Sequence, residues 1–339
     1  MTQPRILTVI LNWRTPDMTL RAVASALTAM ERLSGEIIIV DNDSGDGSLQ
    51  QMTEHAQAQG WTDGNRVRVV DSGHNGGFGA GNNHGIRAGL SDGSQPEYVY
   101  ILNSDAFPAP DAIRLLLQAV QADPTLWCAG SYIHGEQGDP HQTLFRFPSV
   151  ASEFEGAIRF GPVTRLLRNK VVPLPVPETD MRADWMAGAS VLMRRDVLDE
   201  IGLFDEHFFL YFEETDLFLR ASRAGYGSVY VRDSHVMHIG SVSTGMKQWA
   251  RVPGYWFDSR LHYFVKNHGV AYAAAATCAH LLGGGLHWLR RQIERKPTGT
   301  APHFLRTLLS HDVISAMRAL GGARKPSSRQ AVPADRKRC

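Results

Sequence analysis

The sequence predicts an α/β protein with a mostly parallel central sheet and a C-terminal helical extension. Over residues 6–105, short apolar, β-branched runs alternate with stretches of helical apolar spacing, which is typical of parallel sheets. Polar residues follow several of these runs directly, and beyond Tyr255 the spacing becomes helical. The 339 residues, 43% of them hydrophobic, suffice for one large core with an appendage.

In the first part of the chain we expect helices at Asp17–Leu33 and from Asp46 onward. The expected strands are Ile6–Leu11, Glu36–Val40, Arg66–Val70 and Tyr98–Leu102. Parallel strands bind ligands beyond their carboxyl ends, where this sequence places Asn12, the cluster that starts at Asp41, and Asp105.

Later elements are expected to be shorter. The Gly- and Pro-rich residues 130–177 predict loops with short elements, and the tail from Gly321 predicts little structure. The remaining expected elements are a strand at Trp185–Leu192, a short helix at Asp196–Ile201 and a strand at Gly227–Val231. The segment Phe208–Ala224 starts aromatic and is expected to become a helix.

Charge is unevenly distributed although the net charge is only +1. Leu286–Cys339 carries 12 Lys or Arg against 3 Asp or Glu, whereas the rest carries 23 against 31. A basic tail favours an anionic surface, or it is simply solvated. Asn267–Leu289 lacks charged residues but is too weakly apolar to predict a membrane span. The N-terminus lacks a signal-peptide core, and three scattered cysteines favour a reducing compartment.

Three segments in the first half could bind a nucleotide or a metal ion. After the second strand, Asp41 and Asp43 could accept hydrogen bonds from a base or a ribose, or serve only as turn residues. Asn75–Gly85 contains five glycines, whose backbone amides could approach a diphosphate; the alternative is a flexible loop. Its spacing fits neither the dinucleotide fingerprint nor the P-loop. Asp105, after a strand, could bind a hard cation or belong to a turn.

The strongest cluster of acids is Glu213, Glu214 and Asp216, which follows an aromatic run. Adjacent carboxylates in an apolar context raise one another's pKa, as a general base requires. The alternative is a helix N-terminus, where acids favour the helix dipole. Of two nearby histidines, either is a metal ligand or serves the structure, and His238 is preferred to His235 as the ligand because a loop-like turn follows it.

Taken together, these segments resemble family 2 glycosyltransferases, and most closely their bacterial rhamnosyltransferase-like branch. The resemblance spans about Ile6–Phe264. It rests on the motifs Val40-Asp41-Asn42, Asp46-Gly47-Ser48, Asn75-Gly76-Gly77-Phe78-Gly79, Asn103-Ser104-Asp105, Trp185-Met186-Ala187-Gly188-Ala189, Arg194-Arg195, Gly202-Leu203-Phe204-Asp205-Glu206, Glu213-Glu214-Thr215-Asp216-Leu217 and His238-Ile239-Gly240-Ser241. It implies a GT-A fold, a nucleotide-sugar donor, a divalent cation (Mg²⁺ or Mn²⁺) and inversion at the anomeric carbon.

Roles follow from the resemblance position by position. Asp41 matches the residue that binds the base, and Asp105 matches the last acid of the D-x-D metal motif. The first acid of that motif is Asn103 here, so metal binding needs a further ligand, for which His238 is the candidate. Glu214 stands where the family often has an Asp base, with Glu213 as the neighbouring candidate. The remaining expected contacts are Asn12, Asp43, Asn75, Gly77, Asn82 and Asn103 for the donor, and Trp185 and Asp216 for the acceptor.

The resemblance also implies an organisation and a setting. Residues 1–254 form the catalytic domain, with a nucleotide-sugar half (1–106) and an acceptor half (107–254). A helical extension (255–320) and a basic flexible tail (321–339) follow. We expect transfer from dTDP-rhamnose, or else a UDP-sugar, to a saccharide or lipid-linked acceptor in cell-surface polysaccharide synthesis. The expected location is the cytoplasm, with peripheral contact at the inner membrane face and no nucleic-acid partner. The alternatives are a sugar-phosphate nucleotidyltransferase and a non-catalytic sugar- or membrane-binding scaffold.

Overall fold

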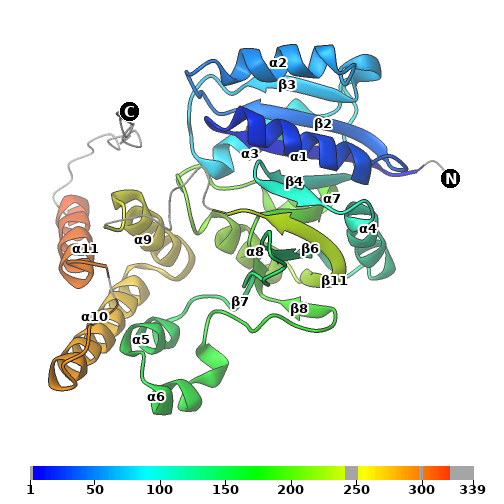
Figure 1. Cartoon of the computed structure of the whole chain (residues 1–339). Coiled ribbons are helices and arrows are strands. Elements are labelled where there is room, and N and C mark those ends of the chain that lie inside the picture. Colours follow the sequence, from blue (N-terminus) through cyan, green and yellow to red (C-terminus); the bar gives the residue numbers. More distant parts are fainter. Residues whose placement is uncertain (1–2, 241–250, 298, 300, 321–339) are drawn as a thin grey trace.

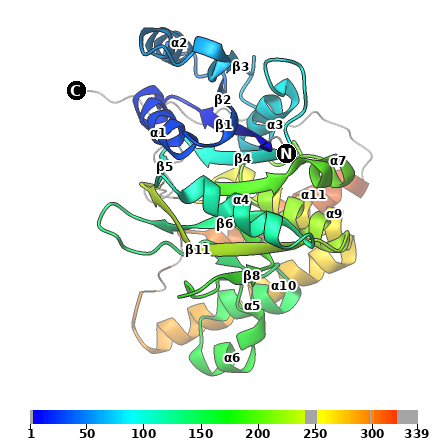
Figure 2. The same cartoon turned by 90° about the vertical axis from the view of Figure 1, so that its right-hand side faces the viewer.

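A computed structural model describes residues 3–240, 251–297, 299 and 301–320. A mixed sheet of nine strands runs in the order β3-β2-β1-β4-β10-β6-β11-β5, and β8 pairs with β11 (Figure 1). Helices cover both faces of the sheet, and the C-terminal helices lie beside it (Figures 1 and 2). The predicted α/β class with a helical extension is therefore confirmed.

The first half of the sheet is parallel, as expected. Its strands are β1 (Arg5–Asn12), β2 (Ser34–Asp41), β3 (Val67–Asp71) and β4 (Tyr98–Asn103). Between them lie α1 (Pro16–Ala29), α2 (Ser48–Ala58), the 3₁₀ turn η1 (Asp63–Asn65) and α3 (Phe78–Ala88). The register pairs Asn12 with Asp41 and Leu11 with Asn103, so the polar carboxyl ends share one edge of the sheet.

The second half of the sheet is mixed, because β10 is antiparallel to both β4 and β6. The strands are β5 (Ala106–Pro108), β6 (Leu126–His134), β8 (Met181–Ala183), β10 (Ser190–Arg194) and β11 (Gly227–His238), while β7 (Leu144–Phe145) and β9 (Trp185–Met186) form a separate pair. The helices are α4 (Ala112–Ala122), α5 (Val150–Ile158), α6 (Gly161–Leu166), the 3₁₀ turn η2 (Arg168–Lys170), α7 (Arg195–Ile201) and α8 (Glu213–Arg223).

Three local predictions need correction. The loop region expected from residue 130 begins inside β6, where small residues suit a buried central strand and the missing side chain of Gly130 makes room for Met186. The strand expected at Trp185–Leu192 is broken at residues 187–189, where the backbone turns toward α8. The expected glycine loop is largely helical, because α3 begins at Phe78.

Two apolar layers enclose the sheet. One layer joins it to α1 and α4 through residues such as Ile10, Val23 and Leu116. The other joins it to α3, α7 and α8 through residues such as Val9 and Leu217. Burial of these side chains is the main favourable contribution to folding, and it holds the strand ends in fixed positions.

The C-terminal helices are α9 (Gly254–His268), α10 (Val270–Ile293) and α11 (Phe304–Leu320). Arg260 of α9 is 1% exposed and binds Glu153 of α5 at 2.7 Å and Asp312 of α11 at 3.5 Å, so charge pairing links these helices. None of the described helices has the length and hydropathy needed to cross a bilayer. The predicted basic tail at 321–339 lies outside the described residues.

Candidate active site

A cavity of about 630 Å³ opens at the carboxyl ends of the strands. It combines strand ends, the glycine-rich loop, the loop at 140–143, residues 187–189, the segment before α8, and Tyr255 of α9. Seven predicted site residues line it: Asn75, Gly77, Asn103, Asp105, Glu213, Glu214 and His238. Residues far apart in the sequence therefore form one polar cavity.

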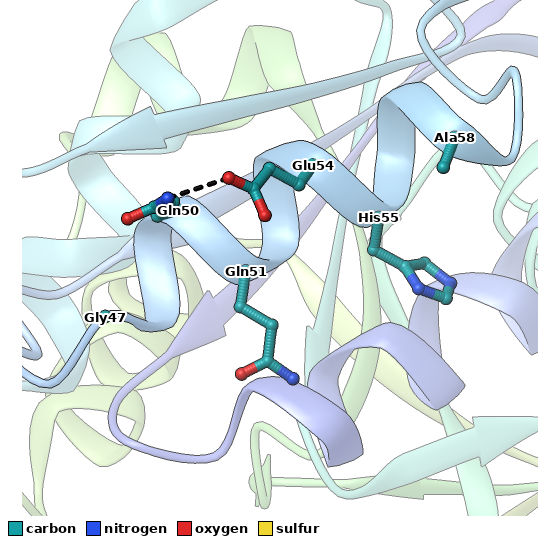
Figure 3. Close-up of a pocket in the computed structure, with 6 residues that line it drawn as sticks. All are labelled: Gly47, Gln50, Gln51, Glu54, His55 and Ala58. Carbon is teal, nitrogen blue, oxygen red and sulfur yellow. Dashed lines mark hydrogen bonds between the residues drawn. The ribbon is translucent and has the colours of Figure 1, made fainter.

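A second hollow, of about 440 Å³, lies along α2 (Figure 3). Its side chains come from that helix, and Gln50 donates to Glu54 at 2.7 Å. No strand end and no group of acids lines this hollow, so the larger cavity is the candidate active site.

The ends of β1 and β2 form a hydrogen-bonded base beneath the cavity. Asp41 is 3% exposed and accepts from Asn12 Nδ2 at 2.6 Å and from Ser44 Oγ at 2.6 Å. Its neighbour Asn42 and the nearby Trp13 line the cavity, whereas Asn12, Asp41 and Asp43 do not. The structure thus shows Asp41 organising this corner, and its contact with a base stays a prediction.

The glycine-rich loop is fixed between β2 and the segment before α8. Asn42 Nδ2 donates to Asn75 Oδ1 at 3.0 Å, and Phe78 N donates to Phe209 O at 3.0 Å. Gly77 has a φ of 90°, and a Cβ there would lie 1.8 Å from Phe209 O. Both the backbone angle and the close approach therefore require glycine at this position.

Asn82, also predicted to contact the donor, is buried in α3 and donates to Phe78 O at 2.9 Å. It is outside the cavity lining. Its observed role is to support the turn that starts α3, and a donor contact stays a prediction.

Asp105 and His238 meet at the cavity wall, although 133 residues separate them. His238 Nε2 lies 3.0 Å from Asp105 Oδ1, and Gly240 N donates to Asp105 Oδ2 at 3.1 Å. Asn103 Oδ1 is buried and has no hydrogen-bond partner among the residues that the structure describes. A carboxylate, an imidazole and an amide oxygen are all ligands of divalent cations, so this group fits a metal site.

A different group, Asp205, His207 and His262, also has ligand atoms close enough to share an ion. None of the three lines the cavity, and His207 is largely exposed. Lys266 Nζ already lies 2.8 Å from Asp205 Oδ2, so a positive charge occupies this position. Asp105 and His238 are therefore the better-placed pair for a cation at the cavity.

Glu213 and Glu214 begin α8 and face the cavity. Glu213 is 1% exposed, and burial together with the neighbouring charge of Glu214 raises its pKa well above the usual value. Burial also raises the pKa of Glu214. Glu214 Oε1 accepts from Gly188 N at 3.1 Å, and a Cβ on Gly188 would lie 2.9 Å from that oxygen. The carboxyl is therefore held in place and has a raised proton affinity, as a general base needs.

The segment before α8 has an uncommon backbone. Tyr211 and Phe212 have φ values of 70° and 68°, a left-handed conformation that costs energy for aromatic residues. Helix α9 stabilises this turn: Ser259 Oγ donates to Leu210 O at 3.0 Å, and the ring of Phe212 packs against Tyr263 at 5.5 Å. The position of both glutamates thus depends on the C-terminal helices.

The two residues predicted to bind the acceptor lie outside the cavity lining. Asp216 is fully buried and pairs with Arg220 at 2.9 Å and Lys266 at 2.8 Å, which ties α8 to α9. Trp185 stacks on Phe145 with ring centroids 4.2 Å apart. Both hold structure around the cavity here, and direct acceptor contact stays a prediction.

Sequence reasoning missed several lining residues. Trp13 lines the cavity and directly follows Asn12, the last residue of β1. An aromatic residue at the carboxyl end of a strand was the signal that could have identified it. The loop residues His141, Gln142 and Thr143, and Tyr255 from α9, carried no local signal. They reach the cavity through tertiary contacts.

The chain matches the model of the family described as Glycosyl transferase family 2 over residues 7–181, more than half of its length. It is 29% identical over 240 residues to the N-acetylglucosaminyl-diphospho-decaprenol L-rhamnosyltransferase of Mycobacterium tuberculosis, covering 66% of this chain and 73% of that protein. It is 27% identical over 165 residues to the rhamnosyltransferase WbbL of Escherichia coli, covering 48% of this chain and 60% of that one.

A solved structure of the mannosyltransferase PcManGT from Pyrobaculum calidifontis, in complex with GDP-Man and Mn²⁺, has a similar fold. The TM-score is 0.50 at 13% identity, over 96% of this chain and 89% of the other. This likeness supports the GT-A fold that the sequence predicted.

Proposed function

The chain belongs to glycosyl transferase family 2 and is a glycosyltransferase, and we propose that its donor is a nucleoside-diphosphate sugar, with dTDP-rhamnose ahead of a UDP-sugar. Two relatives that are named rhamnosyltransferases support rhamnose as the sugar. The mannosyltransferase of similar fold was solved with a nucleotide sugar, which supports the donor class.

One observation carries the proposal: a buried acid pair and a carboxylate–imidazole pair suited to a divalent cation line the same cavity. Glu213 and Glu214 come from the start of α8, while Asp105 and His238 come from the ends of β4 and β11. Transfer of a sugar needs a base for the acceptor and charge compensation for the leaving diphosphate. These two groups could supply both functions.

In the proposed reaction Glu214 accepts the proton of the acceptor hydroxyl. The oxygen of that hydroxyl forms a bond to the anomeric carbon as the bond to the diphosphate oxygen breaks, and the electron pair leaves with the nucleoside diphosphate. A single displacement of this kind inverts the anomeric centre. The hydrogen bond from Gly188 N orients the Glu214 carboxyl, and Glu213 lies beside it with a pKa that burial and the charge of Glu214 raise.

A divalent cation, Mg²⁺ or Mn²⁺, would be held by Asp105, His238 and Asn103 Oδ1, and it would supply positive charge against the diphosphate. The solved mannosyltransferase contained Mn²⁺, which supports this assignment. Amides at the start of α3 would add to the same compensation, because a helix N-terminus favours anions.

For the acceptor we propose a lipid-linked saccharide, in the assembly of a cell-surface polysaccharide at the inner face of the cytoplasmic membrane. The name of the mycobacterial relative describes rhamnosyl transfer to a sugar carried on decaprenyl diphosphate. Aromatic side chains of Phe209, Tyr211 and Tyr255 line one side of the cavity, and such rings suit the apolar faces of sugars.

The test is a donor screen that measures nucleoside diphosphate release from dTDP-rhamnose, UDP-sugars and GDP-mannose, with Mg²⁺, with Mn²⁺ and with EDTA. We expect cation-dependent release that is fastest with dTDP-rhamnose. Equal rates with EDTA would exclude a role for the cation in turnover. Faster turnover of a UDP-sugar would show that this sugar, rather than rhamnose, is the one transferred. No release from any donor, with binding absent as well, would contradict the proposed donor class.

A further inference from the structure

Helix α10 presents an apolar stripe to solvent. Leu282, Leu286, Leu289 and Ile293 recur at intervals of four, three and four residues, and their exposed fractions are 59%, 44%, 51% and 75%. This spacing places all four side chains on one side of the helix. An exposed stripe of large aliphatic residues is the kind of surface that binds an apolar partner.

The opposite side of α10 is fully packed. Gly283 lies against α5, where an added Cβ would approach Phe154 O at 2.7 Å, and Gly284 lies against Leu305 of α11. Ala276 and His287 on the same side are buried. The inner side of α10 is therefore already packed against α5 and α11, whereas the apolar stripe lies on the outer, solvent-exposed side.

The segment of α6 extends this apolar surface. The guanidinium of Arg290 lies 4.9 Å from the ring centroid of Phe160, and its Nη2 donates to Arg159 O at 2.8 Å. Phe160 is 41% exposed and Leu166 is 82% exposed. Figures 1 and 2 both show α6 and the end of α10 at the same lower end of the molecule. We call α6 with residues 159–170, together with the outer side of α10, the α6–α10 surface.

Basic residues flank these apolar residues along the chain, and three of them share the carboxylate of Glu294. Residues 156–177 contain no Asp or Glu, and α10 ends in a cluster of bases in which Glu294 is the one acid. The basic side chains are Arg159, Arg165, Arg168, Lys170, Arg290, Arg291, Arg295 and Lys296. Residues 1–285 as a whole carry 23 bases against 31 acids, so this part of the chain is basic where the rest is acidic.

Charge decides between the possible occupants. A second copy of the chain docked about a two-fold axis would place these bases against the same bases, which repel. An anionic lipid surface offers the opposite charge to the bases and an apolar layer to the leucines. We propose that the α6–α10 surface binds an anionic lipid bilayer, with α10 lying in the headgroup region rather than crossing it.

This docking would bring the enzyme to the membrane that carries the proposed lipid-linked acceptor. That benefit rests on the proposed function. Helix α9, which supplies Tyr255 to the cavity, packs on α10. A bilayer bound at α10 therefore touches the group of helices that forms one side of the cavity.

The test is flotation of the full chain with phosphatidylcholine vesicles that contain either no phosphatidylglycerol or about one third of it, at low and high salt. We expect binding to the anionic vesicles at low salt, and weaker binding at high salt. Ile293→Glu should weaken binding at least 10-fold, because it places a charge in the stripe. Replacing Arg165, Arg168 and Lys170 with Ser should weaken it on the order of 100-fold.

The matched control is Met317→Glu, which also changes an exposed apolar residue, 58% exposed, but on α11. Unchanged binding of this variant is expected, and a loss equal to that of Ile293→Glu would overturn the assignment to the α6–α10 surface. Equal binding of the wild-type chain to both vesicle types, or to neither, would overturn an anionic bilayer as the partner. A concentration-dependent dimer that Ile293→Glu abolishes would point to a second copy instead.

Donor turnover without lipid separates this proposal from the proposed function. Ile293→Glu should keep the wild-type rate of nucleoside diphosphate release and the wild-type melting temperature, since Ile293 is far from buried. If the chain releases nucleoside diphosphate but does not bind vesicles, only the proposed membrane docking is refuted. A chain that binds anionic vesicles but turns over no donor would refute the proposed function alone.

Discussion

The cavity wall that carries Asn42 and Asp105 consists of strand ends, whereas the wall that carries Glu213 and Glu214 is a turn followed by a helix N-terminus. The first wall is held by the register of parallel strands and by short hydrogen bonds such as Asn12 to Asp41. The second contains two left-handed residues and relies on Ser259 and Tyr263 of α9. The first wall is positioned by the sheet to which it belongs. The second wall needs contacts from α9, a helix that begins about 40 residues after the start of α8.

This difference shows that the helical extension is more than an appendage. Asp216, in the first turn of α8, pairs with Lys266 of α9, and Asn267 donates to the same carboxylate at 2.8 Å. The boundary predicted at residue 254 separates Glu213 and Glu214, the proposed catalytic acids, from side chains of α9 that hold α8 in place. We expect damage to α9 to affect catalysis before it affects nucleotide binding.

The largest effect should come from the second wall itself. Glu214→Gln removes the proposed base, so turnover should fall by a factor on the order of 10² or more, while donor binding changes little. Steady-state diphosphate release and calorimetry of donor binding measure the two quantities. Glu178→Gln, at an exposed position, is the control and should keep full turnover. Wild-type turnover in Glu214→Gln would remove this residue from the role.

On the first wall, Asp105→Ala should abolish the enhancement of nucleotide binding by Mg²⁺ or Mn²⁺. The expected loss of cation-dependent affinity is about 10- to 100-fold, because a ligand and the partner of His238 disappear together. Calorimetry with cation and with EDTA measures it, and Asp233→Ala, an exposed acid on β11, is the control. Binding that is still enhanced by the cation would show that Asp105 is not a ligand.

The dependence on α9 can be tested with Ser259→Ala. Losing the hydrogen bond to Leu210 O costs about 1 kcal/mol and should lower kcat a few-fold, with the KM for the donor unchanged. Ser310→Ala, on the exposed side of α11, is the matched control. If Ser259→Ala lowers the melting temperature but leaves kcat intact, α9 supports the fold without positioning the acids.

The smallest expected effect concerns the stability of the acid pair. The pKa of Glu213 is raised in the folded state, so its contribution is fully present below the unfolded pKa and is lost as pH rises through the folded pKa. Glu213→Gln should therefore raise the melting temperature at pH 8, by roughly 1–2 °C for a gain of about 1 kcal/mol. Near pH 4 the gain should vanish. A gain of equal size at both pH values would mean that packing, rather than charge, causes it.

Much of the first wall could be predicted from the sequence, because its signals are local. The apolar run Ile6–Leu11 and the acids after Glu36–Val40 predict strands with polar ends, and the structure confirms both strands. Asn75, Gly77 and Asn103 were expected near the donor, and they do line the cavity. Asp41 and Asn12 were expected there too, but their side chains turn toward each other beneath it.

The sequence by itself determined the fold class, the family resemblance and the acids on α8, because hydrophobic periodicity, turn chemistry and motif spacing are properties of neighbouring residues. Three features are visible only in the three-dimensional structure: β10 enters the sheet antiparallel, His238 contacts Asp105, and α9 supports the turn before α8. Contacts of this kind join residues tens to more than a hundred positions apart. They depend on how whole layers pack against one another, and no local pattern encodes that arrangement.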